Sequence, residues 1–432
     1  MPNLILNSHR MKLPIISLLL VPVAVLADPA NDTPACDITE LAMYAPDQLD
    51  AVVCLDELSA DAVKSLQATG ADWIYTQPLK RCGINDRRPG LLLSAIHAGS
   101  GNEALTLTDE AGKPVCSSPI QLPRVAPVPD WQSPAAEHFI DVNGIRTRYL
   151  EAGEGTPLVL VHGGQAGGNN NSADKWEQNF AELSRHYRVI APDRLGQGQT
   201  GNPPAEDYAD YYAKDAEHLK AFIDALGLQD FILAGHSQGG WPVTRVALDK
   251  PGQTRCLINI DTVMVPDDRE LMGQALGFLM YQSRMLHPAS GPTFYSARRG
   301  MRLRYPSGNN ITDSKAKRVV EQSQLQKTKD AAAAMRAARM TPLSPAFTGL
   351  KQEAMTEIAD GGLKARSVVI WGAEDPQVPL ALGELFQQQL DDAGVNGGMF
   401  VIGGSGHAPF VEFPEKFAEI VVNACSSGNQ DN

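Results

Sequence analysis

The sequence predicts an α/β fold in which a mostly parallel sheet lies between two layers of helices. Two observations support this. From His138 onward, short apolar runs alternate with segments of helical spacing. Several of these runs are apolar without interruption, such as Leu158–Val161, which is expected of strands buried on both faces. Alternation of this kind is typical of a sheet whose parallel strands are connected by helices.

The predicted elements follow one another in a regular order. Residues 138–153 are expected to form a hairpin that turns at Asn143-Gly144, a dipeptide favoured in two-residue turns. The remaining predicted strands lie within 156–164, 188–194, 230–237, 255–261, 367–375 and 397–404. The predicted helices lie within 174–187, 208–227, 238–252, 379–394 and 414–425.

A long insertion, residues 266–362, interrupts this alternation and divides the predicted core into 135–265 and 363–432. It is rich in helical segments, among them 271–285. Its basic stretch SARRGMRLRYP contains Arg298, Arg299, Arg302 and Arg304. In so acidic a chain these arginines are expected on a solvated, ion-paired surface. The alternative is that Arg299 and Arg302 bind an anionic group of a substrate.

Residues 1–27 are expected to be a secretory signal peptide. The basic segment His9–Lys12 precedes an apolar run with two prolines, and Val25 and Ala27 occupy the positions that a signal peptidase reads. The run is short for a membrane-spanning helix, and no cysteine follows the cleavage site, so neither a membrane anchor nor a lipid anchor is predicted. The expected location is therefore secreted or periplasmic.

Residues 28–134 are expected to form a separate, cysteine-containing region. A helix-compatible segment, 57–70, precedes strand-like runs at 91–98 and 104–116 and a proline-rich linker from Ser117. An even number of cysteines in an oxidising compartment favours disulfides. We expect pairs within the early group and one bridge between the two late cysteines, for which buried free thiols are the alternative. The early cysteines are Cys36, Cys54, Cys82 and Cys116, and the late ones are Cys256 and Cys425.

Composition and charge argue against several partners. The formal net charge is −13, which opposes binding to the phosphate backbone of nucleic acids. The sequence has no C-x-x-C or H-x-x-x-H spacing, so no zinc site is expected, and it lacks the G-x-x-x-x-G-K-[ST] phosphate loop. We therefore expect a small-molecule substrate and predict no cofactor and no metal.

The stretch AGHSQGGW, Ala234–Trp241, contains the candidate nucleophile. Ser237 lies within G-x-S-x-G, with a predicted strand before it and a predicted helix after it, which is the context of a nucleophile elbow. Gly235 and Gly239 supply the small neighbours that so sharp a turn needs. The N-terminus of the following helix favours developing negative charge. The alternative interpretation is a tight structural turn.

A serine hydroxyl needs a base, and that base needs an acid to orient it. His407 follows a late predicted strand in the glycine-rich stretch GGSGHAP, which suits a general base. Asp375 follows the predicted strand before it, so the order of nucleophile, acid and base is Ser237, Asp375, His407. The alternative acids are Glu374, which is adjacent in sequence, and Asp261, at the end of a neighbouring strand.

Backbone N–H groups are expected to bind the oxyanion. One belongs to Gln238, the residue after the nucleophile. The other belongs to Gly164 or Gln165, where glycines let the backbone approach a substrate closely. Further candidates for substrate contact are His162, Gly163 and Trp241. Packing is an equal alternative for Trp241, Trp176, Tyr208, Tyr211 and Tyr212.

From about His138 to Cys425 the chain resembles an α/β hydrolase. VHGG, APDRLGQGQT, GHSQGG, WGAEDPQVP and GSGHAPFVEFP occur in the order that this family has. The resemblance implies an eight-stranded, mostly parallel α/β-hydrolase sheet with a helical cap after the sixth strand, at 266–362. Some members use an aspartate nucleophile, but Ser237 stands in that place here, which implies acyl transfer to water. The cysteine-containing N-terminal region departs from the core of the family.

Three functions are compatible with these residues. The first is a secreted serine hydrolase that cleaves carboxylic esters through an acyl-enzyme on Ser237. The second keeps the same triad but cleaves amides or peptides, or carbon–carbon bonds in diketones. The third is a non-catalytic binding module on the same fold, which usually lacks a triad member, whereas all three are present here.

Overall fold

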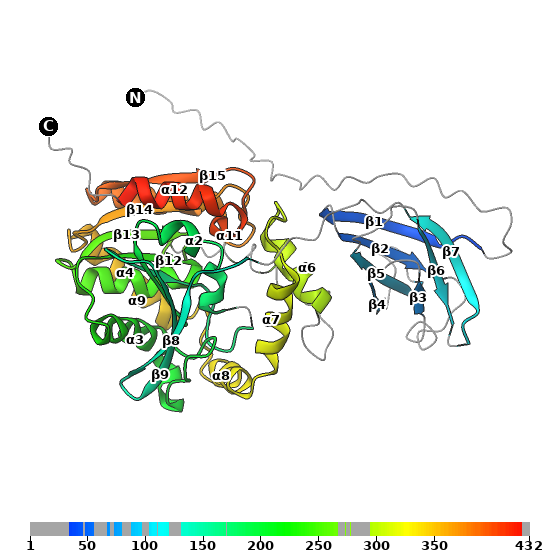
Figure 1. Cartoon of the computed structure of the whole chain (residues 1–432), viewed down its shortest axis with the longest axis horizontal. Helices are drawn as coiled ribbons and strands as arrows, with labels where there is room; N and C mark the ends of the chain where they lie inside the picture. Colours follow the sequence, from blue (N-terminus) through cyan, green and yellow to red (C-terminus); the bar gives the residue numbers. More distant parts are fainter. Residues whose placement is uncertain are drawn as a thin grey trace, which may run out of the picture. The chain divides into compact units, whose positions relative to one another are not determined.

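The computed structural model describes residues 34–45, 48–55, 67–69, 73–79, 88–96, 103–109, 111–120, 131–169, 171–266, 273, 277 and 294–425. The chain divides into two compact units, Met1–Pro127 and Val128–Asn432 (Figure 1). The predicted signal peptide, Cys82 and nearly all of the predicted helical segment 271–285 lie outside the described residues. None of the described helices is both long and apolar enough to span a membrane.

The first unit contains two antiparallel sheets. One has the order β1-β2-β5-β4, formed by β1 (Asp37–Ala45), β2 (Gln48–Cys54), β5 (Gly90–Ile96) and β4 (Trp73–Leu79). The other has the order β3-β6-β7, formed by β3 (Gln67–Thr69), β6 (Glu103–Thr108) and β7 (Pro114–Ile120). Cys36 and Cys116 form a disulfide in this unit, with Cα atoms 4.9 Å apart, and Cys54 is also disulfide-bonded.

Three predictions for this unit were wrong. The end of the predicted helix 57–70 is strand β3, because Gln67–Thr69 pairs with β6 through backbone hydrogen bonds. The strand-like run 104–116 is two strands, β6 and β7, which pair with each other around a turn at Gly112. Strand β7 also continues to Ile120, so the linker does not begin at Ser117.

The second unit is built on one eight-stranded sheet, as the sequence predicts. Its order is β15-β14-β13-β12-β10-β11-β9-β8. Strands β10 to β15 are parallel to one another, whereas β9 is antiparallel to both β11 and β8. The strands are β8 (Ala136–Val142), β9 (Ile145–Ala152), β10 (Pro157–Val161), β11 (Arg188–Pro192), β12 (Phe231–His236), β13 (Thr254–Ile260), β14 (Arg366–Gly372) and β15 (Gly397–Ile402).

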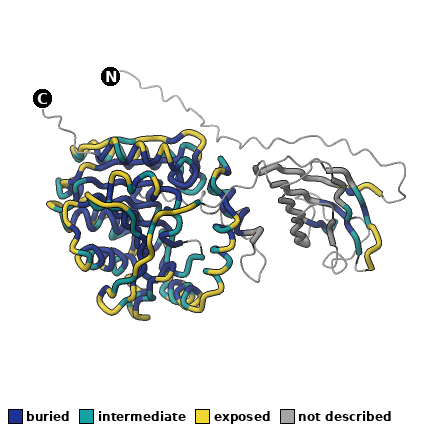
Figure 2. The backbone as a smooth tube through the Cα atoms, viewed as in Figure 1, coloured by how far each residue is buried: buried dark blue, intermediate teal, exposed yellow. Residues whose placement is uncertain are grey.

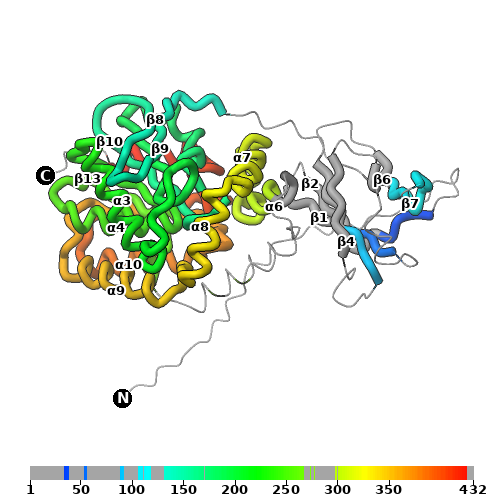
Figure 3. The backbone as a smooth tube through the Cα atoms, turned by 90° about the horizontal axis from the view of Figure 1, so that it is seen from below, coloured from blue at the N-terminus to red at the C-terminus, as the bar shows by residue number. Residues whose placement is uncertain are grey.

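Helices cover both faces of this sheet, because its central strands are apolar on both sides. In β10, Val159 and Val161 pack toward one face and Leu158 and Leu160 toward the other. The first face carries α3 (Tyr211–Ala225), α4 (Gly240–Asp249), α9 (Pro345–Ala359) and α10 (Leu380–Asp392) (Figure 3). The second carries α2 (Phe180–Leu183), α11 (Pro409–Glu412) and α12 (Pro414–Cys425). Figure 2 shows dark blue, buried backbone through the middle of this unit, where strands β10 to β14 are mostly buried.

The predicted bridge between the two late cysteines lies on the second face. Cys256 of β13 and Cys425 of α12 form a disulfide with Cα atoms 5.8 Å apart. The predicted helix 174–187 also lies on this face but is much shorter than its spacing suggests. It is a 3₁₀ turn, η1 (Ala173–Trp176), followed by the single turn of α2.

The insertion contributes three helices that are described, α6 (Phe294–Arg304), α7 (Asp313–Gln324) and α8 (Gln326–Ala337). Its predicted boundary at 362 is too late, because α9 is a helix of the core. Phe347, Ala354 and Ile358 of α9 are buried with α4 and α10 against the sheet. Ser344 caps this helix by accepting a hydrogen bond from the N–H of Phe347.

The parallel strands end at one common edge of the sheet, and this edge positions the candidate site. Ser237 directly follows β12 and Asp261 directly follows β13. Asp375 and His407 follow β14 and β15 after short loops, and Gly164 follows β10. Residues far apart in the sequence therefore meet at the carboxyl ends of five neighbouring strands.

Candidate active site

Ser237 lies on the strained turn between β12 and α4. Its φ is +53°, a value that residues other than glycine seldom adopt. The turn closes tightly, since a Cβ on Gly235 would lie 2.4 Å from the carbonyl oxygen of Gly239, and a Cβ on Gly163 would lie 2.7 Å from the Cβ of Ser237. This is the geometry of a nucleophile elbow, which holds the serine side chain above the edge of the sheet.

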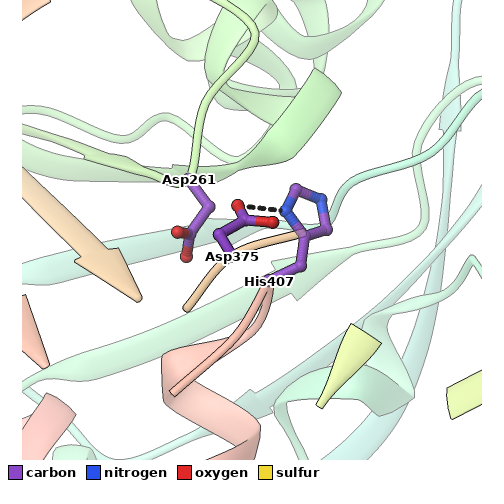
Figure 4. A group of neighbouring side chains, drawn as sticks. All are labelled: Asp261, Asp375 and His407. Atoms are coloured by element: carbon purple, nitrogen blue, oxygen red, sulfur yellow. Dashed lines mark hydrogen bonds and ion pairs between the residues drawn. The ribbon is translucent and has the colours of Figure 1, made fainter. Parts of the chain in front are cut away.

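The structure brings Ser237, His407 and Asp375 into one hydrogen-bonded chain. The Nε2 atom of His407 lies 3.0 Å from Oγ of Ser237, and its Nδ1 atom lies 2.7 Å from Oδ2 of Asp375 (Figure 4). The other carboxylate oxygen, Oδ1, accepts backbone N–H groups of Gln377 and Val378 at 2.7 and 3.1 Å. The Asp375 carboxylate thus receives the Nδ1–H, which leaves Nε2 to accept the hydroxyl proton of Ser237.

The backbone of His407 is fixed by two further hydrogen bonds. Its N–H donates to the carbonyl oxygen of Arg304, at the end of α6, over 2.8 Å. Its carbonyl oxygen accepts the Nε2–H of His236 over 2.6 Å. Burial and the neighbouring His407 hold the pKa of His236 far below its usual value, so this imidazole is neutral. His236 therefore supports the loop of the candidate base.

Glu412 holds the same loop from α11, and no local pattern in the sequence selects this residue. Its Oε1 accepts the N–H of Gly406 at 2.6 Å and the hydroxyl of Ser405 at 3.1 Å. Its Oε2 accepts the N–H and the hydroxyl of Ser307, at 3.0 and 2.6 Å. Burial raises the pKa of Glu412 to about 7 despite these donors. One carboxyl group thus joins the histidine loop to the insertion.

Three backbone N–H groups are available to form an oxyanion hole. Among the described residues, those of Gly164, Gln165 and Gln238 donate no hydrogen bond within the protein. Gly164 has a φ of +87°, and a Cβ there would lie 2.1 Å from the side chain of Asn171. The Tyr212 hydroxyl lies 3.3 Å from Oε1 of Gln238 and 3.5 Å from Oε1 of Gln165. One tyrosine thus contacts the side chains of two of the three residues whose N–H groups are available.

Arg194 supports the loop that carries Gly164. Its Nη1 donates to the carbonyl oxygens of His162 and Gly164 at 3.2 and 2.5 Å, and its backbone N–H donates to Nε2 of His162 at 3.1 Å. Its guanidinium also forms a fully buried ion pair with Asp215. Arg194 belongs to the stretch APDRLGQGQT, but no local pattern in that stretch selects this arginine.

Asn171 and Lys175 support the loop from its other side. The Nδ2 of Asn171 donates to the carbonyl oxygen of Gln165 at 3.4 Å, and its Oδ1 accepts from Nζ of Lys175 at 3.2 Å. Burial and the nearby Arg304 and Arg194 lower the pKa of Lys175 to about 7. The ammonium group of Lys175 therefore loses its proton more readily than that of an exposed lysine.

Two residues predicted to contact substrate lie in the core instead. His162 is fully buried, with Nδ1 donating to the carbonyl oxygen of Gly163 and Nε2 accepting from Arg194, and burial lowers its pKa far below the usual value. Trp241 is also buried, and its Nε1–H donates to the carbonyl oxygen of Tyr212 at 2.7 Å. Gly163 lies directly beneath Ser237.

The arginines of the insertion were expected on a solvated surface, which is wrong for two of them. Arg298 and Arg302 are buried in α6, because the inner side of this helix packs with α7 and joins the apolar cluster that also covers the second face of the sheet. Arg298 does form an ion pair, with Asp313. The side chain of Arg299 lies outside the described part of the structure.

The alternative acids occupy different places. Glu374 donates its backbone N–H to the carbonyl oxygen of Ser405 at 2.8 Å and brings no side-chain atom to the histidine. Asp261 lies beside the triad, since one side-chain ligand atom each of Asp261, Asp375 and His407 lies within 4.8 Å of the others. Among the described residues this is the one such cluster of His, Cys, Asp and Glu that could hold a cation, but Nδ1 of His407 is already committed to Asp375.

Comparison with known proteins supports the same fold. The chain matches the model of the alpha/beta hydrolase family over residues 158–420. A 2-hydroxymuconate semialdehyde hydrolase from Pseudomonas putida is 29% identical over 294 residues, which are 68% of this chain and 95% of that protein. A 2-hydroxy-6-oxo-6-(2'-aminophenyl)hexa-2,4-dienoic acid hydrolase from Metapseudomonas resinovorans is 42% identical over 112 residues, which are 25% of this chain and 36% of that protein.

A solved structure agrees with these relatives. A serine hydrolase involved in carbazole degradation is 25% identical and has a TM-score of 0.52, over 67% of this chain and 98% of that chain. The family match includes Ser237, Asp375 and His407 and the strand ends that carry them. The chain is thus a hydrolase and belongs to the alpha/beta hydrolase family.

Proposed function

We propose that this hydrolase cleaves an acyl bond of a small molecule through a covalent acyl-enzyme on Ser237. One observation carries the proposal, namely the unbroken hydrogen-bonded chain from Oγ of Ser237 through His407 to Asp375. A serine on a strained elbow, with a base at 3.0 Å and that base oriented by a carboxylate, is the arrangement that activates a hydroxyl nucleophile.

The geometry suggests the following steps. Nε2 of His407 takes the hydroxyl proton of Ser237 as Oγ attacks the acyl carbon. The N–H groups of Gln238 and of Gly164 or Gln165 stabilise the resulting oxyanion. The imidazolium, held by Asp375, returns the proton to the leaving group as the acyl bond breaks. Water then attacks the acyl-enzyme while His407 accepts its proton. The bond from the acyl carbon to Oγ breaks, His407 returns the proton to Oγ of Ser237, and the acid is released.

The relatives favour a carbon–carbon bond as the bond that breaks. Two 2-hydroxymuconate semialdehyde hydrolases align over 95% and 93% of their own lengths, at 29% and 28% identity. Loss of a carbon leaving group requires that its electron pair be delocalised, as in a conjugated enol, and that a proton be delivered to carbon. We therefore place first a dienoate with a keto group next to the scissile bond.

Ester hydrolysis is the second candidate. The triad and the three unpaired N–H groups fit direct attack on an ester carbonyl, whose oxygen leaving group needs no conjugation.

Export through residues 1–27 is a separate proposal, supported by the basic and apolar pattern of that segment. Fusing this segment to a reporter that is active only after export tests it.

The experiment compares the purified enzyme with Ser237→Ala on a 2-hydroxy-6-oxo-dienoate and a p-nitrophenyl ester. Loss of the nucleophile is expected to lower kcat by roughly 10⁵- to 10⁶-fold with an unchanged circular dichroism spectrum. Ser133→Ala, at an exposed serine, is the matched control and should turn over normally. Normal turnover by Ser237→Ala would exclude the serine mechanism. The substrate with the higher kcat/KM identifies the bond.

A further inference from the structure

We propose that Asp261 is a positioning residue of this site: its carboxyl group stays protonated, donates a hydrogen bond to the carboxylate of Asp375, and so fixes that carboxylate on Nδ1 of His407. The inference rests on the proposed function, since it concerns the acid of the same triad. It differs from the sequence-based alternative in which Asp261 replaces Asp375 as the ionised acid.

The backbone places Asp261 firmly at the carboxyl end of β13. Its φ is +41°, and its N–H donates to the carbonyl oxygen of Ile370 in β14 at 3.0 Å. Its Oδ1 accepts the N–H of Gly372, the last residue of β14, at 2.9 Å. The carboxyl group is therefore anchored to the strand that leads into the loop of Asp375.

The second carboxyl oxygen of Asp261, Oδ2, is the atom that we expect to carry the proton. The side chain is fully buried, and Oδ2 accepts no hydrogen bond from the described residues. Figure 4 shows Asp261 beside Asp375, on the side away from His407. An ionised Asp261 would thus leave a buried charged oxygen without a donor, next to a second carboxylate. The carboxylate of Asp375, which has an oxygen within 4.8 Å of a side-chain oxygen of Asp261, is the acceptor that a protonated Oδ2 would use.

The donors around the two carboxyl groups decide which one holds the proton. Two adjacent buried carboxylates do not both ionise readily. Asp375 receives the Nδ1–H of His407 and two backbone N–H groups, whereas Asp261 receives one N–H group. Ionisation is therefore favoured at Asp375. Burial, the charge of Asp375 and the more distant Glu412 all raise the pKa of Asp261 well above its ordinary value, in agreement with this assignment.

The bond from Asp261 would complete the coordination of Asp375. A carboxylate has about four lone-pair sites, and three are used by His407, Gln377 and Val378. A fourth bond from the Asp261 hydroxyl fills the last site and leaves the carboxylate one orientation. It also lowers the basicity of Asp375, which disfavours transfer of the imidazolium proton from His407.

The decisive variant is Asp261→Asn, because an amide reproduces the protonated acid. Its Oδ1 can accept the N–H of Gly372 and its Nδ2 can donate to Asp375. We expect kcat within about 3-fold of the native value and an unshifted acid limb in the pH profile of kcat/KM. If Asp261 is ionised in the native enzyme, removing its charge lowers the pKa of His407, and the acid limb moves to lower pH. That shift would overturn the proposal.

Asp261→Leu removes the donor while keeping the branched arrangement of side-chain heavy atoms. We expect kcat to fall by 10-fold or more with KM within 2-fold, and the acid limb to move to higher pH, because Asp375 becomes more basic. Asp375→Asn is the comparison and should lower kcat by roughly 10⁴-fold. Since Asp261→Leu introduces a buried leucine and can fail to fold, infrared spectroscopy provides a readout independent of activity.

The native enzyme at neutral pH should show a carbonyl-stretching band of a protonated carboxylic acid that is missing from Asp261→Asn. Absence of a difference between the two spectra would contradict the proposal. The proposed function fails separately, through turnover by Ser237→Ala. An inactive Ser237→Ala together with a shifted acid limb in Asp261→Asn would overturn this inference alone.

Discussion

Replacing Arg194 by methionine is expected to destabilise the second unit and to slow turnover for different physical reasons. Arg194 is 3% exposed, and its side chain lies against Asp215, which is 2% exposed. Methionine has a similar length but no donors. The substitution therefore leaves the Asp215 carboxylate and the carbonyl oxygens of His162 and Gly164 without the partner they have now.

The magnitude follows from these lost contacts. Breaking a buried ion pair by removing one partner costs about 3–5 kcal/mol, because the remaining charge stays buried. Asp215 keeps a backbone donor, Leu195, and burial already opposes its ionisation, so part of the cost is relieved when the carboxyl takes up a proton. We expect Arg194→Met to lower the free energy of unfolding by about 3 kcal/mol, near the lower end of that range.

The assay is urea unfolding followed by fluorescence, combined with steady-state kinetics on the best substrate. Arg194→Met/Asp215→Asn removes the uncompensated charge and keeps an acceptor for Leu195, so it should recover about 2 kcal/mol or more of the lost stability. It does not restore the two bonds to the oxyanion loop. The double variant should therefore remain about 10²-fold slower than the native enzyme in kcat.

Two results would refute this reasoning. A decrease in the free energy of unfolding of less than about 1 kcal/mol in the single variant would mean that Arg194 does not offset the cost of burying the Asp215 carboxylate. Full recovery of kcat in the double variant would mean that Arg194 acts on turnover only through stability. Arg185→Met is the control, since this arginine is exposed and pairs with Glu182 on the surface, and it should change stability by less than about 0.5 kcal/mol.

Three other predictions follow from the same geometry. Gly164→Ala should lower kcat by about 10- to 10³-fold, because its Cβ would meet Asn171, whereas Gly155→Ala, at positive φ in open space, should not; equal kinetics would contradict this. The raised pKa of Glu412 makes the free energy of unfolding of the native enzyme fall by about 3 kcal/mol as the pH rises from 4.5 to 7. Glu412→Gln cannot ionise and should abolish this fall, so parallel curves of unfolding free energy against pH for the two proteins would refute the prediction. Cys256→Ala/Cys425→Ala should lower the free energy of unfolding by about 2–5 kcal/mol, measured against the oxidised native chain, and an unchanged Tm would contradict it.

The residues that the sequence could predict share one property. Ser237, Asp375 and His407 each follow an apolar strand within a short stretch rich in glycine or proline, so local pattern and chain order were sufficient to select them. The order of the parallel strands then brings their ends together without further information.

The residues that escaped prediction act across long sequence separations. Glu412 meets Ser307, 105 residues away, and Arg194 meets the carbonyl oxygen of His162, 32 residues away. No local spacing reports such contacts, because they depend on how α11 and the insertion pack. Strands such as β1 and β2 were missed for a related reason, since their mixed sequences become strands through pairing with each other.

The hydrogen bond from His407 to the carbonyl oxygen of Arg304 has a consequence for protein engineering. Cap segments are attractive units for chimeras, because they are inserted at one point of a conserved scaffold. In this chain the segment between β13 and β14 also supplies an acceptor for the backbone of the candidate base, and Ser307 adds two donors to the carboxylate beneath that loop. A chimera in which residues 294–307 are replaced to change the substrate range would therefore also change the position of His407. Such a chimera should keep Arg304 and Ser307 or include residues that form the same two contacts.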